Sequence, residues 1–268
     1  MELIVRAGVG YDNIDTKTAK AQNVRVENVP GKNVHAVAEL VVAFMFYEDR
    51  KIHLNDQSSK NNQWNKSKFG SARGLRDRTV GILGLGKIGI NVAKTALALG
   101  MKVIFSSLEH EIGQKIFPLG NTNGQFSCEC VSLVNLFKSS DVLTLHIPMT
   151  KGTKNIIQAK TLSLMKKNAF LINTARGGVV NEQDLISHLN QNPGFKYACD
   201  VFQGEPSYKK GKVDKALLRH KSVISTHHIG AGTQQASFAV GTGLYNQLEL
   251  FVTRGKFVNV VNFLSPKL

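Results

Sequence analysis

Short apolar runs alternate along the chain with segments of helical periodicity. The runs that predict strands are Glu2–Arg6, Val24–Val29, Val80–Leu83, Met101–Phe105, Asp141–Ile147, Ala169–Asn173, Tyr197–Val201 and Val223–Thr226. Helical patterns begin near Asp15 and span Val34–His53, Ile88–Leu99, Thr161–Met165 and Glu182–Leu189. Because strands that alternate with helices form parallel sheets, the pattern predicts an α/β fold with a doubly wound parallel sheet.

The run Val80–Leu83 leads into three glycines in G-x-G-x-x-G spacing, and a helical pattern follows them. Gly84 permits a tight turn, Gly86 lets the backbone approach a pyrophosphate, and Gly89 lets the helix pack close to the strand. The unpaired N–H groups at the start of the helix then face the phosphates. This stretch predicts a dinucleotide-binding turn in a Rossmann-type sheet.

The next predicted strand, Met101–Phe105, ends where an NAD-binding domain usually carries an acid that holds the ribose hydroxyls. Ser106 and Ser107 stand at that place, with Glu109 and His110 just beyond. Without the carboxylate nothing repels a 2′-phosphate, and serine hydroxyls can donate to phosphate oxygens. Because no arginine stands here to bind that phosphate, we expect NAD, with NADP as the open alternative.

Side chains of catalytic types follow three predicted strands, at the edge where such sheets bind ligands: Arg176, Asp200 and His228. A guanidinium can bind the carboxylate of a 2-oxo or 2-hydroxy acid, and the two glycines after Arg176 offer it on flexible backbone. When a carboxylate such as Glu205 lies beside a histidine, it raises the pKa of the histidine and fixes the histidine's tautomer for proton transfer. A surface arginine and structural histidines are the alternatives. Because His227 and His228 face opposite sides of an extended chain, we expect chemistry from only one.

A glycine-rich turn, Ala7–Asn13, follows the first predicted strand. Backbone N–H groups after such a turn can hold a carboxylate, and Arg6 can pair with a second anionic group of the same ligand. A turn that merely packs, with a surface arginine beside it, explains these residues equally well.

The helical pattern Val34–Tyr47 is apolar nearly all round, which is more than one packing face needs. We expect it to be buried between domains or across a subunit interface, with core packing in a monomer as the alternative. Asn33 is expected to cap this helix. The pattern carries His35 and Glu39 and is too short to span a bilayer, so no membrane partner is expected.

The polar stretch from Asn55 to Arg78 predicts a surface excursion.

The chain has 268 residues, enough for one or two domains, and its 34 Lys and Arg against 19 Asp and Glu give a net charge of +15. The basic residues are scattered, with mild concentrations at Lys60–Arg78 and Lys209–Lys221, and they are not interleaved with aromatics. We therefore expect a solvated basic surface with sites for small anions, and no nucleic-acid partner. Three cysteines and the lack of a signal peptide favour the cytoplasm, and no cysteine or histidine spacing predicts a metal site.

Seven runs resemble, in order, the D-isomer-specific 2-hydroxyacid dehydrogenase family. They are Arg6–Asp15 (RAGVGYDNID), Asn28–Leu40 (NVPGKNVHAVAEL), Thr79–Gly89 (TVGILGLGKIG), His146–Thr150 (HIPMT), Ile172–Val180 (INTARGGVV), Asp200–Pro206 (DVFQGEP) and Thr226–Gly230 (THHIG). The resemblance implies hydride transfer between a nicotinamide and C2 of a small D-2-hydroxy acid that carries a phosphate. It also implies a homodimer formed through the helix that begins at Val34.

The resemblance assigns roles by position. It implies that Arg176 binds the substrate's carboxylate and oxygen, that His228 is the acid/base, and that Glu205 orients this histidine. Asp200 would hold the nicotinamide carboxamide. The other cofactor contacts that it implies are Gly84, Gly86, Lys87, Ile88, Gly89, Ser107, His146, Pro148, Thr174 and Ala175. The substrate contacts that it implies are Gly8, Val9, Gly10 and Asn33, with Arg6 for the phosphate.

The resemblance also implies two domains, a dinucleotide-binding domain over 34–231 and a discontinuous substrate domain of 1–33 and 232–268. The family's substrate domain is flavodoxin-like and begins with two further strand–helix units, so this one would be truncated. It is expected to lean on the nucleotide domain or a partner. No regulatory domain follows in this sequence, so we expect no allosteric control by an end product. A nucleotide-sensing binding protein without turnover is the alternative function.

Overall fold

The computed structural model describes residues 1–116, 118, 127–206 and 215–263, and it divides into two units. The smaller unit comprises Met1–Val37 and Gly230–Leu268, and the larger comprises Ala38–Ile229. The basic concentration expected over Lys209–Lys221 lies outside the described residues up to position 214.

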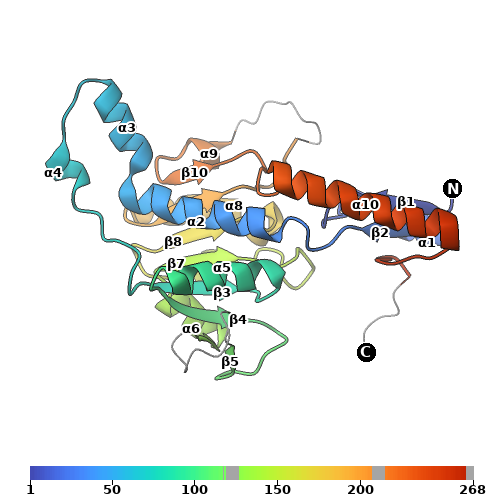
Figure 1. The fold of residues 1–268 in the computed structure, drawn as a ribbon. Coiled ribbons are helices and arrows are strands. Elements are labelled where there is room, and N and C mark those ends of the chain that lie inside the picture. Colours follow the sequence, from blue (N-terminus) through green and yellow to red (C-terminus); the bar gives the residue numbers. More distant parts are fainter. Residues whose placement is uncertain (117, 119–126, 207–214, 264–268) are drawn as a thin grey trace. The chain divides into compact units, whose positions relative to one another are not determined.

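A parallel sheet forms the centre of the larger unit (Figure 1). Over the described residues its order is β10-β9-β8-β7-β3-β4-β6-β5. The strands are β3 (Thr79–Leu83), β4 (Lys102–Ser106), β5 (Lys115–Ile116), β6 (Cys128–Cys130), β7 (Val142–Leu145), β8 (Phe170–Asn173), β9 (Lys196–Cys199) and β10 (Val223–Ser225). Neighbouring strands run parallel, except that β5 is antiparallel to β6. The predicted α/β class with a doubly wound parallel sheet is confirmed.

Helices cover both faces of this sheet because its central strands are apolar on both sides. The helical segments from α2 to α9 are α2 (Val34–Arg50), α3 (Ile52–Lys60), α4 (Lys66–Phe69), α5 (Lys87–Ala98), α6 (Leu133–Ser139), α7 (Ala159–Leu162), η1 (Gly177–Val179), α8 (Glu182–Gln191) and α9 (Ala216–Arg219). In β8, Phe170 and Ile172 join one core cluster, with α2 and α5, while Leu171 joins the other, with α6, α8 and α9. The alternation follows from the period of two in a strand.

The end of α2 differs from the prediction of one helix as far as His53. Lys51 has φ +50°, in the left-handed region, so α2 ends at Arg50 and α3 begins at Ile52. The apolar character of α2 is used in the core of the larger unit, where Val41 and Met45 are buried, and this fits the alternative of core packing. Some apolar surface remains on α2, because Phe46 is 37% exposed.

Sequence reasoning did not predict several elements. The expected excursion between Asn55 and Arg78 contains most of α3 and all of α4, and β5, β6, α6 and α9 had no counterpart among the predicted elements. The longest omission is α10 (Gln234–Arg254), in which Gly241 and Gly243 weaken the helical pattern. A Cβ at Gly243 would lie 2.6 Å from Val29 Cγ1, so this glycine permits close packing on the chain after β2.

The smaller unit pairs β1 (Leu3–Arg6) with β2 (Arg25–Asn28) in parallel, joined by α1 (Thr16–Ala21). The helix starts where the sequence predicted, because the Asp15 carboxylate accepts hydrogen bonds from the N–H groups of Lys17 and Thr18. Buried polar groups tie the C-terminal part to β2. Asn262 accepts from Val26 N at 2.9 Å and donates to Val24 O at 2.8 Å.

Among the described residues, no helix is long and apolar enough to cross a bilayer.

Candidate active site

The three glycines of the dinucleotide turn occupy different environments. Gly84 has φ +93°, and a Cβ there would lie 2.8 Å from His146 O. A Cβ at Gly89 would lie 2.4 Å from Gly84 O, so the start of α5 packs directly on the turn. Gly86 has no other atom within 4 Å of the Cβ position. The turn is therefore tight on its protein side and open at Gly86, as a bound pyrophosphate requires.

The first turn of α5 offers free donors beside that open position. Gly86 is the N-terminal cap residue, and among the described residues no side chain caps the helix, so its first N–H groups can donate to a ligand. Lys87 is exposed at the helix start, and Ile88 packs against the core. The strand order reverses at β3 and β7, and the turn lies at the carboxyl end of β3, where sheets of this kind bind nucleotides.

His146 follows β7 at the same edge. Its Nε2 lies 2.9 Å from Thr144 Oγ1, and burial lowers the pKa of His146 to about 3. The ring is therefore uncharged at physiological pH and adds no positive charge beside the turn. Pro148, two residues on, accepts a hydrogen bond from Thr153 Oγ1 at 2.6 Å through its carbonyl, which fixes the loop after β7.

The end of β4 carries no carboxylate. Ser107 follows the strand directly, half-buried, and its Oγ accepts a hydrogen bond from Glu109 N at 3.3 Å. His110 lies edge-on to Phe105, with 5.1 Å between the ring centroids. Ser107 thus supplies a hydroxyl at the position where an NAD-binding domain usually carries an acid.

The loop after β8 holds Arg176 by buried polar contacts. Asn173, fully buried at the strand end, donates to Arg176 O and accepts from Ala175 N, both at 3.0 Å. Arg176 Nη1 in turn donates to Ala175 O at 2.7 Å. The Oγ1 of Thr174 is buried and has no hydrogen-bond partner among the described residues. A buried hydroxyl of this kind usually pairs with a bound water or a ligand.

Gly177 brings the Arg176 loop against the loop that carries Glu205. A Cβ at position 177 would lie 2.1 Å from the carbonyl carbon of Phe202, so only glycine permits this approach. The glycines after Arg176 were expected to supply flexible backbone, and the structure adds a further requirement at Gly177. The requirement is steric, and it depends on a segment 25 residues away that the sequence did not connect to this position.

Asp200 is a buried carboxylate that organises the end of β10. Its Oδ1 accepts hydrogen bonds from Thr226 Oγ1 at 2.6 Å and from Ile229 N at 2.7 Å, while its backbone oxygen accepts from His228 N at 2.9 Å. These bonds hold the backbone of His228 at φ +54°, in the left-handed region that residues other than glycine rarely adopt.

His228 and Glu205 form the central pair of the site. His228 Nδ1 lies 2.6 Å from Glu205 Oε2, and Glu205 Oε1 accepts from Phe202 N at 2.9 Å. The hydrogen bond with Glu205 raises the pKa of His228, and it outweighs the opposing effect of burial. Burial raises the pKa of Glu205, but the hydrogen bonds from His228 and Phe202 outweigh it, so the net pKa is lowered.

The larger unit therefore gathers the three proposed catalytic groups at the carboxyl ends of β8, β9 and β10. The positive charge of Arg176 lies near enough to lower the pKa of both Glu205 and His228. Because Nδ1 of the histidine faces the carboxylate, Nε2 is left to exchange a proton with a substrate. Sequence reasoning missed the supporting Asn173 and Thr226, whose only signal was a polar residue at the end of an apolar strand.

The smaller unit contains the proposed substrate contacts. Arg6 donates to Ala7 O, and Gly8, at φ +136°, leaves room for its guanidinium, since a Cβ there would lie 1.8 Å from Arg6 Nη1. Val9 is 37% exposed, and its carbonyl accepts from Asn28 Nδ2 at 2.7 Å.

Two further positions in the smaller unit were proposed as substrate contacts. Gly10 is half-exposed beside the Val9 carbonyl. Asn33 was expected to cap α2, but its Oδ1 is buried and has no hydrogen-bond partner among the described residues, so the capping prediction was wrong. The half-buried Asn33 side chain instead leaves an acceptor that none of the described residues uses.

Comparison with known proteins places this geometry in a class. The family model described as "D-isomer specific 2-hydroxyacid dehydrogenase, NAD binding domain" matches residues 42–230. The chain belongs to this family, whose members are NAD-dependent oxidoreductases. The predicted family and the NAD cofactor are thereby confirmed.

Particular relatives differ in substrate. Hydroxypyruvate reductase of Thermotoga maritima is 35% identical over 92% of this chain and 76% of its own length. D-3-phosphoglycerate dehydrogenase of Methanocaldococcus jannaschii is 37% identical over 98% of this chain, which spans about half (48%) of that relative. The solved structure of D-lactate dehydrogenase from Aquifex aeolicus with NAD and lactic acid matches with a TM-score of 0.83, at 30% identity, over 99% of this chain and 81% of that one.

The residues described above fit an NAD molecule. The open Gly86 position and the first N–H groups of α5 suit its pyrophosphate. The buried Thr174 hydroxyl has no partner among the described residues, and a bound ligand could supply one. The uncharged His146 and the Ser107 hydroxyl leave no formal charge of either sign at their places on the rim.

Proposed function

We propose that the chain interconverts a D-2-hydroxy acid and its 2-oxo acid, with Arg176, Glu205 and His228 as its catalytic residues. The observation that carries the proposal is the 2.6 Å contact between His228 and Glu205, within electrostatic reach of Arg176. Bound NAD supplies the hydride chemistry at substrate C2. Arg176 binds the substrate carboxylate and draws electron density from the neighbouring oxygen.

In this proposal His228 moves one proton at Nε2. During oxidation the neutral ring takes the hydroxyl proton, and during reduction the protonated ring returns it to the carbonyl oxygen. Glu205 holds Nδ1 and stabilises the protonated ring, so it acts as a positioning residue. We also propose that Asp200 holds the carboxamide of the nicotinamide, and that Gly84, Gly86, Lys87, Ile88, Gly89, Ser107, His146, Pro148, Thr174 and Ala175 contact the cofactor.

For the substrate we propose 3-phosphoglycerate and 3-phosphohydroxypyruvate, and with them a role in serine biosynthesis. The similarity to D-3-phosphoglycerate dehydrogenase of Methanocaldococcus jannaschii supports this choice. In the smaller unit, Arg6 would pair with the phosphate, while Gly8, Val9, Gly10 and Asn33 would contact the remainder of the substrate. The names of the hydroxypyruvate reductase and D-lactate dehydrogenase relatives point to competing substrates, hydroxypyruvate and lactate, and the 2-oxo acid of lactate is pyruvate.

The test is the change in NADH absorbance with 3-phosphohydroxypyruvate, hydroxypyruvate and pyruvate, repeated with NADPH. We expect the highest kcat/KM with 3-phosphohydroxypyruvate, and an Arg6→Gln variant should lose that preference while it keeps turnover of hydroxypyruvate. A folded protein that binds NADH but turns over none of the three acids would refute the proposal. It would favour the nucleotide-sensing alternative instead.

We further propose a cytoplasmic homodimer that associates through α2. Phe46 on α2 and Ile52 on α3 are 37% and 52% exposed, apolar surface that a second copy would cover. All three cysteines are free, which suits a reducing compartment. Light scattering should give twice the chain mass, and Phe46→Glu should shift the protein towards monomer. A wild-type monomer at micromolar concentration would contradict the dimer.

A further inference from the structure

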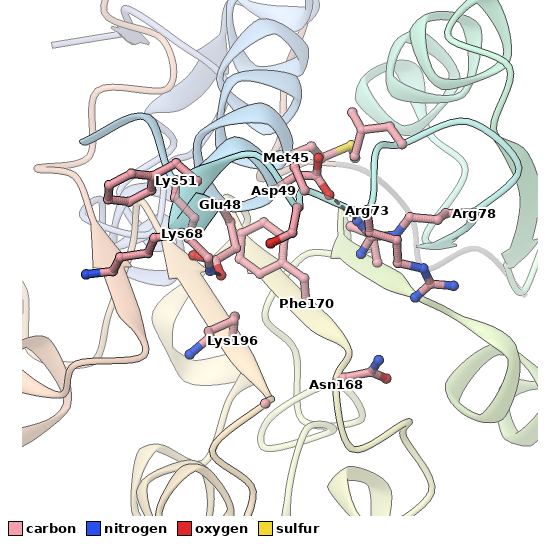
Figure 2. Close-up of a pocket in the computed structure, with 16 residues that line it drawn as sticks. Met45, Glu48, Asp49, Lys51, Lys68, Arg73, Arg78, Asn168, Phe170 and Lys196 are labelled. Atoms are coloured by element: carbon pink, nitrogen blue, oxygen red, sulfur yellow. Dashed lines mark hydrogen bonds and ion pairs between the residues drawn. The ribbon is translucent and has the colours of Figure 1, made fainter. Parts of the chain in front are cut away.

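A cavity lies at the opposite edge of the sheet from the proposed active site. Its volume is about 270 Å³, and it is lined by the end of α2, the segment that contains α4, and the amino ends of β7, β8 and β9 (Figure 2). All of its lining residues belong to the larger unit. In β8 the cavity touches Phe170, while Arg176 lies beyond the other end of the strand. The three residue steps of β8 alone separate the two edges by about 10 Å.

The lining of this amino-edge cavity is predominantly basic. The cationic side chains around it are Lys51, Lys68, Arg73, Arg78 and Lys196. Its carboxylates are Glu48 and Asp49, so five positive and two negative groups leave an excess of three positive charges. A concave surface with one sign of charge concentrates ligands of the opposite sign.

Some of these cations are already paired. Arg78 lies 3.0 Å from Asp49, and the two side chains are only 12% and 4% exposed. Lys51 forms an ion pair with Glu48. Arg73 lies 3.3 Å from Asp141, outside the cavity lining. These pairs build a fixed, hydrogen-bonded wall, and Asp49 also accepts from Gly74 N at 3.1 Å.

The remaining two cations, Lys68 and Lys196, have no carboxylate within ion-pair distance among the residues that the structure describes. Figure 2 shows them on the side of the cavity away from Arg73 and Arg78. Lys196 is half-buried, and its Nζ donates to Pro193 O and to Ser222 Oγ, both at 3.1 Å. Among the described residues, one of its three donors therefore has no partner.

The local setting fixes Lys196 more firmly than a surface lysine. Burial lowers its pKa, which a bound anion would reverse. Lys68 is exposed, and its Nζ lies 5.4 Å from the centroid of the Phe69 ring. A ligand that bridges the two lysines would bring both charges together at a site whose opposite wall is already built.

We propose that this amino-edge cavity binds a small anion with at least two negative charges, carried by phosphate or carboxylate groups. Its volume lies just below the usual range for drug-sized ligands, about 300–1,000 Å³, so it suits a metabolite of a few carbon atoms or a pyrophosphate. A cavity bounded by ion pairs fits such a molecule better than a nucleic acid, which is bound along an extended basic stripe. The assignment does not depend on the reaction proposed for the carboxyl edge.

Calorimetric titration tests the proposal with pyrophosphate and, separately, with citrate, both at constant ionic strength. The double variant Lys68→Gln/Lys196→Gln should weaken binding by about tenfold or more, the loss expected for one charge-assisted hydrogen bond. Lys68→Glu alone should weaken binding as well, and it changes only an exposed side chain. The control Lys160→Gln removes an exposed lysine of α7 that does not line the cavity. A further control, Arg176→Gln, removes the anion site expected at the carboxyl edge.

Binding that survives in the Arg176 and Lys160 variants and falls in both Lys68 variants supports the proposal. Pyrophosphate binding without citrate binding assigns the ligand to phosphates, and the reverse assigns it to carboxylates. Three results would overturn it: no heat beyond the salt-matched buffer, equal binding in the double variant, or loss of binding in Arg176→Gln. Tight binding of duplex DNA with no binding of either small anion would also overturn it, in favour of a nucleic-acid surface.

Discussion

Gly177 stands directly after Arg176, and replacing it with alanine should separate the two loops that carry the catalytic side chains. The new Cβ would lie 2.1 Å from the carbonyl carbon of Phe202, 2.3 Å from its oxygen and 2.6 Å from Gln203 N. Ordinary contact begins at 3.4 Å, so the backbones must move apart by about 1.3 Å, the difference between 3.4 and 2.1 Å. All three atoms belong to the main chain, so no side chain can rotate away to relieve the clash.

Both stability and catalysis should suffer. Overpacking of this kind costs about 1–3 kcal/mol of unfolding free energy. Phe202 N donates to Glu205 Oε1, so a moving Phe202 carries the partner of His228 with it. A misplacement of about 1 Å in an active site costs on the order of 10²-fold in rate. We expect Gly177→Ala to lower kcat/KM by about that factor.

The matched control is the next residue, Gly178→Ala. Its Cβ would lie 2.2 Å from Met149 Sδ, the flexible end of a side chain that can rotate away, so activity and stability should change little. Steady-state turnover of NADH and urea unfolding of both variants provide the comparison. Equal rates in Gly177→Ala and the wild-type protein, or equal losses in the two variants, would refute the steric reasoning.

Three further predictions concern proton transfer, the cofactor and the support of the site. His228→Gln should lower kcat by about 10²–10⁴-fold, measured by NADH absorbance. Because Glu205 raises the pKa of His228, oxidation, which needs the neutral ring, should increase as the pH rises through that pKa, above the ordinary 6.5. Glu205→Gln should move the profile to lower pH, and an unmoved profile would contradict the pairing. Ser107→Asp should weaken NADPH binding by about tenfold or more relative to NADH in fluorescence titrations, by repulsion of the 2′-phosphate. Thr226→Val removes a 2.6 Å hydrogen bond to Asp200 and should cost about 1–3 kcal/mol in urea unfolding, whereas a change below 0.5 kcal/mol would argue against that bond.

The sequence predicted those features of the fold that depend on neighbours along the chain. The glycines at 84, 86 and 89 need only the adjoining strand and helix, and their predicted roles agree with the space found around each of them. The central strands could also be predicted, because a continuous apolar run, typical of a strand buried on both faces, is a local pattern. The end of α2 could not be predicted, because the residue in the left-handed conformation there is Lys51, and neither glycine nor proline marks the position.

Features that depend on contacts between distant parts of the chain could not be predicted from the sequence. The helix α10 contains Gly241 and Gly243, which lower helical propensity, yet Gly243 is what lets the helix approach Val29. The strand β6 has three residues, and its apolar positions are Cys128 and Cys130, which give too short an alternation to stand out. In each case the packing partner, not the local pattern, decides the structure.

The same distinction explains which part of the candidate site was predicted. Arg176 and His228 stand out because their types suggest chemistry, but their positions are set by two buried polar groups, Asn173 and Asp200. Asp200 accepts bonds from the chain on both sides of His228, and these compensate for the cost of its left-handed backbone, on the order of 1–3 kcal/mol. A histidine on an ordinary extended backbone would direct its ring differently. The contact with Glu205 therefore depends on a carboxylate that is itself withdrawn from solvent, and changes at Asp200 should be felt first in the geometry of His228.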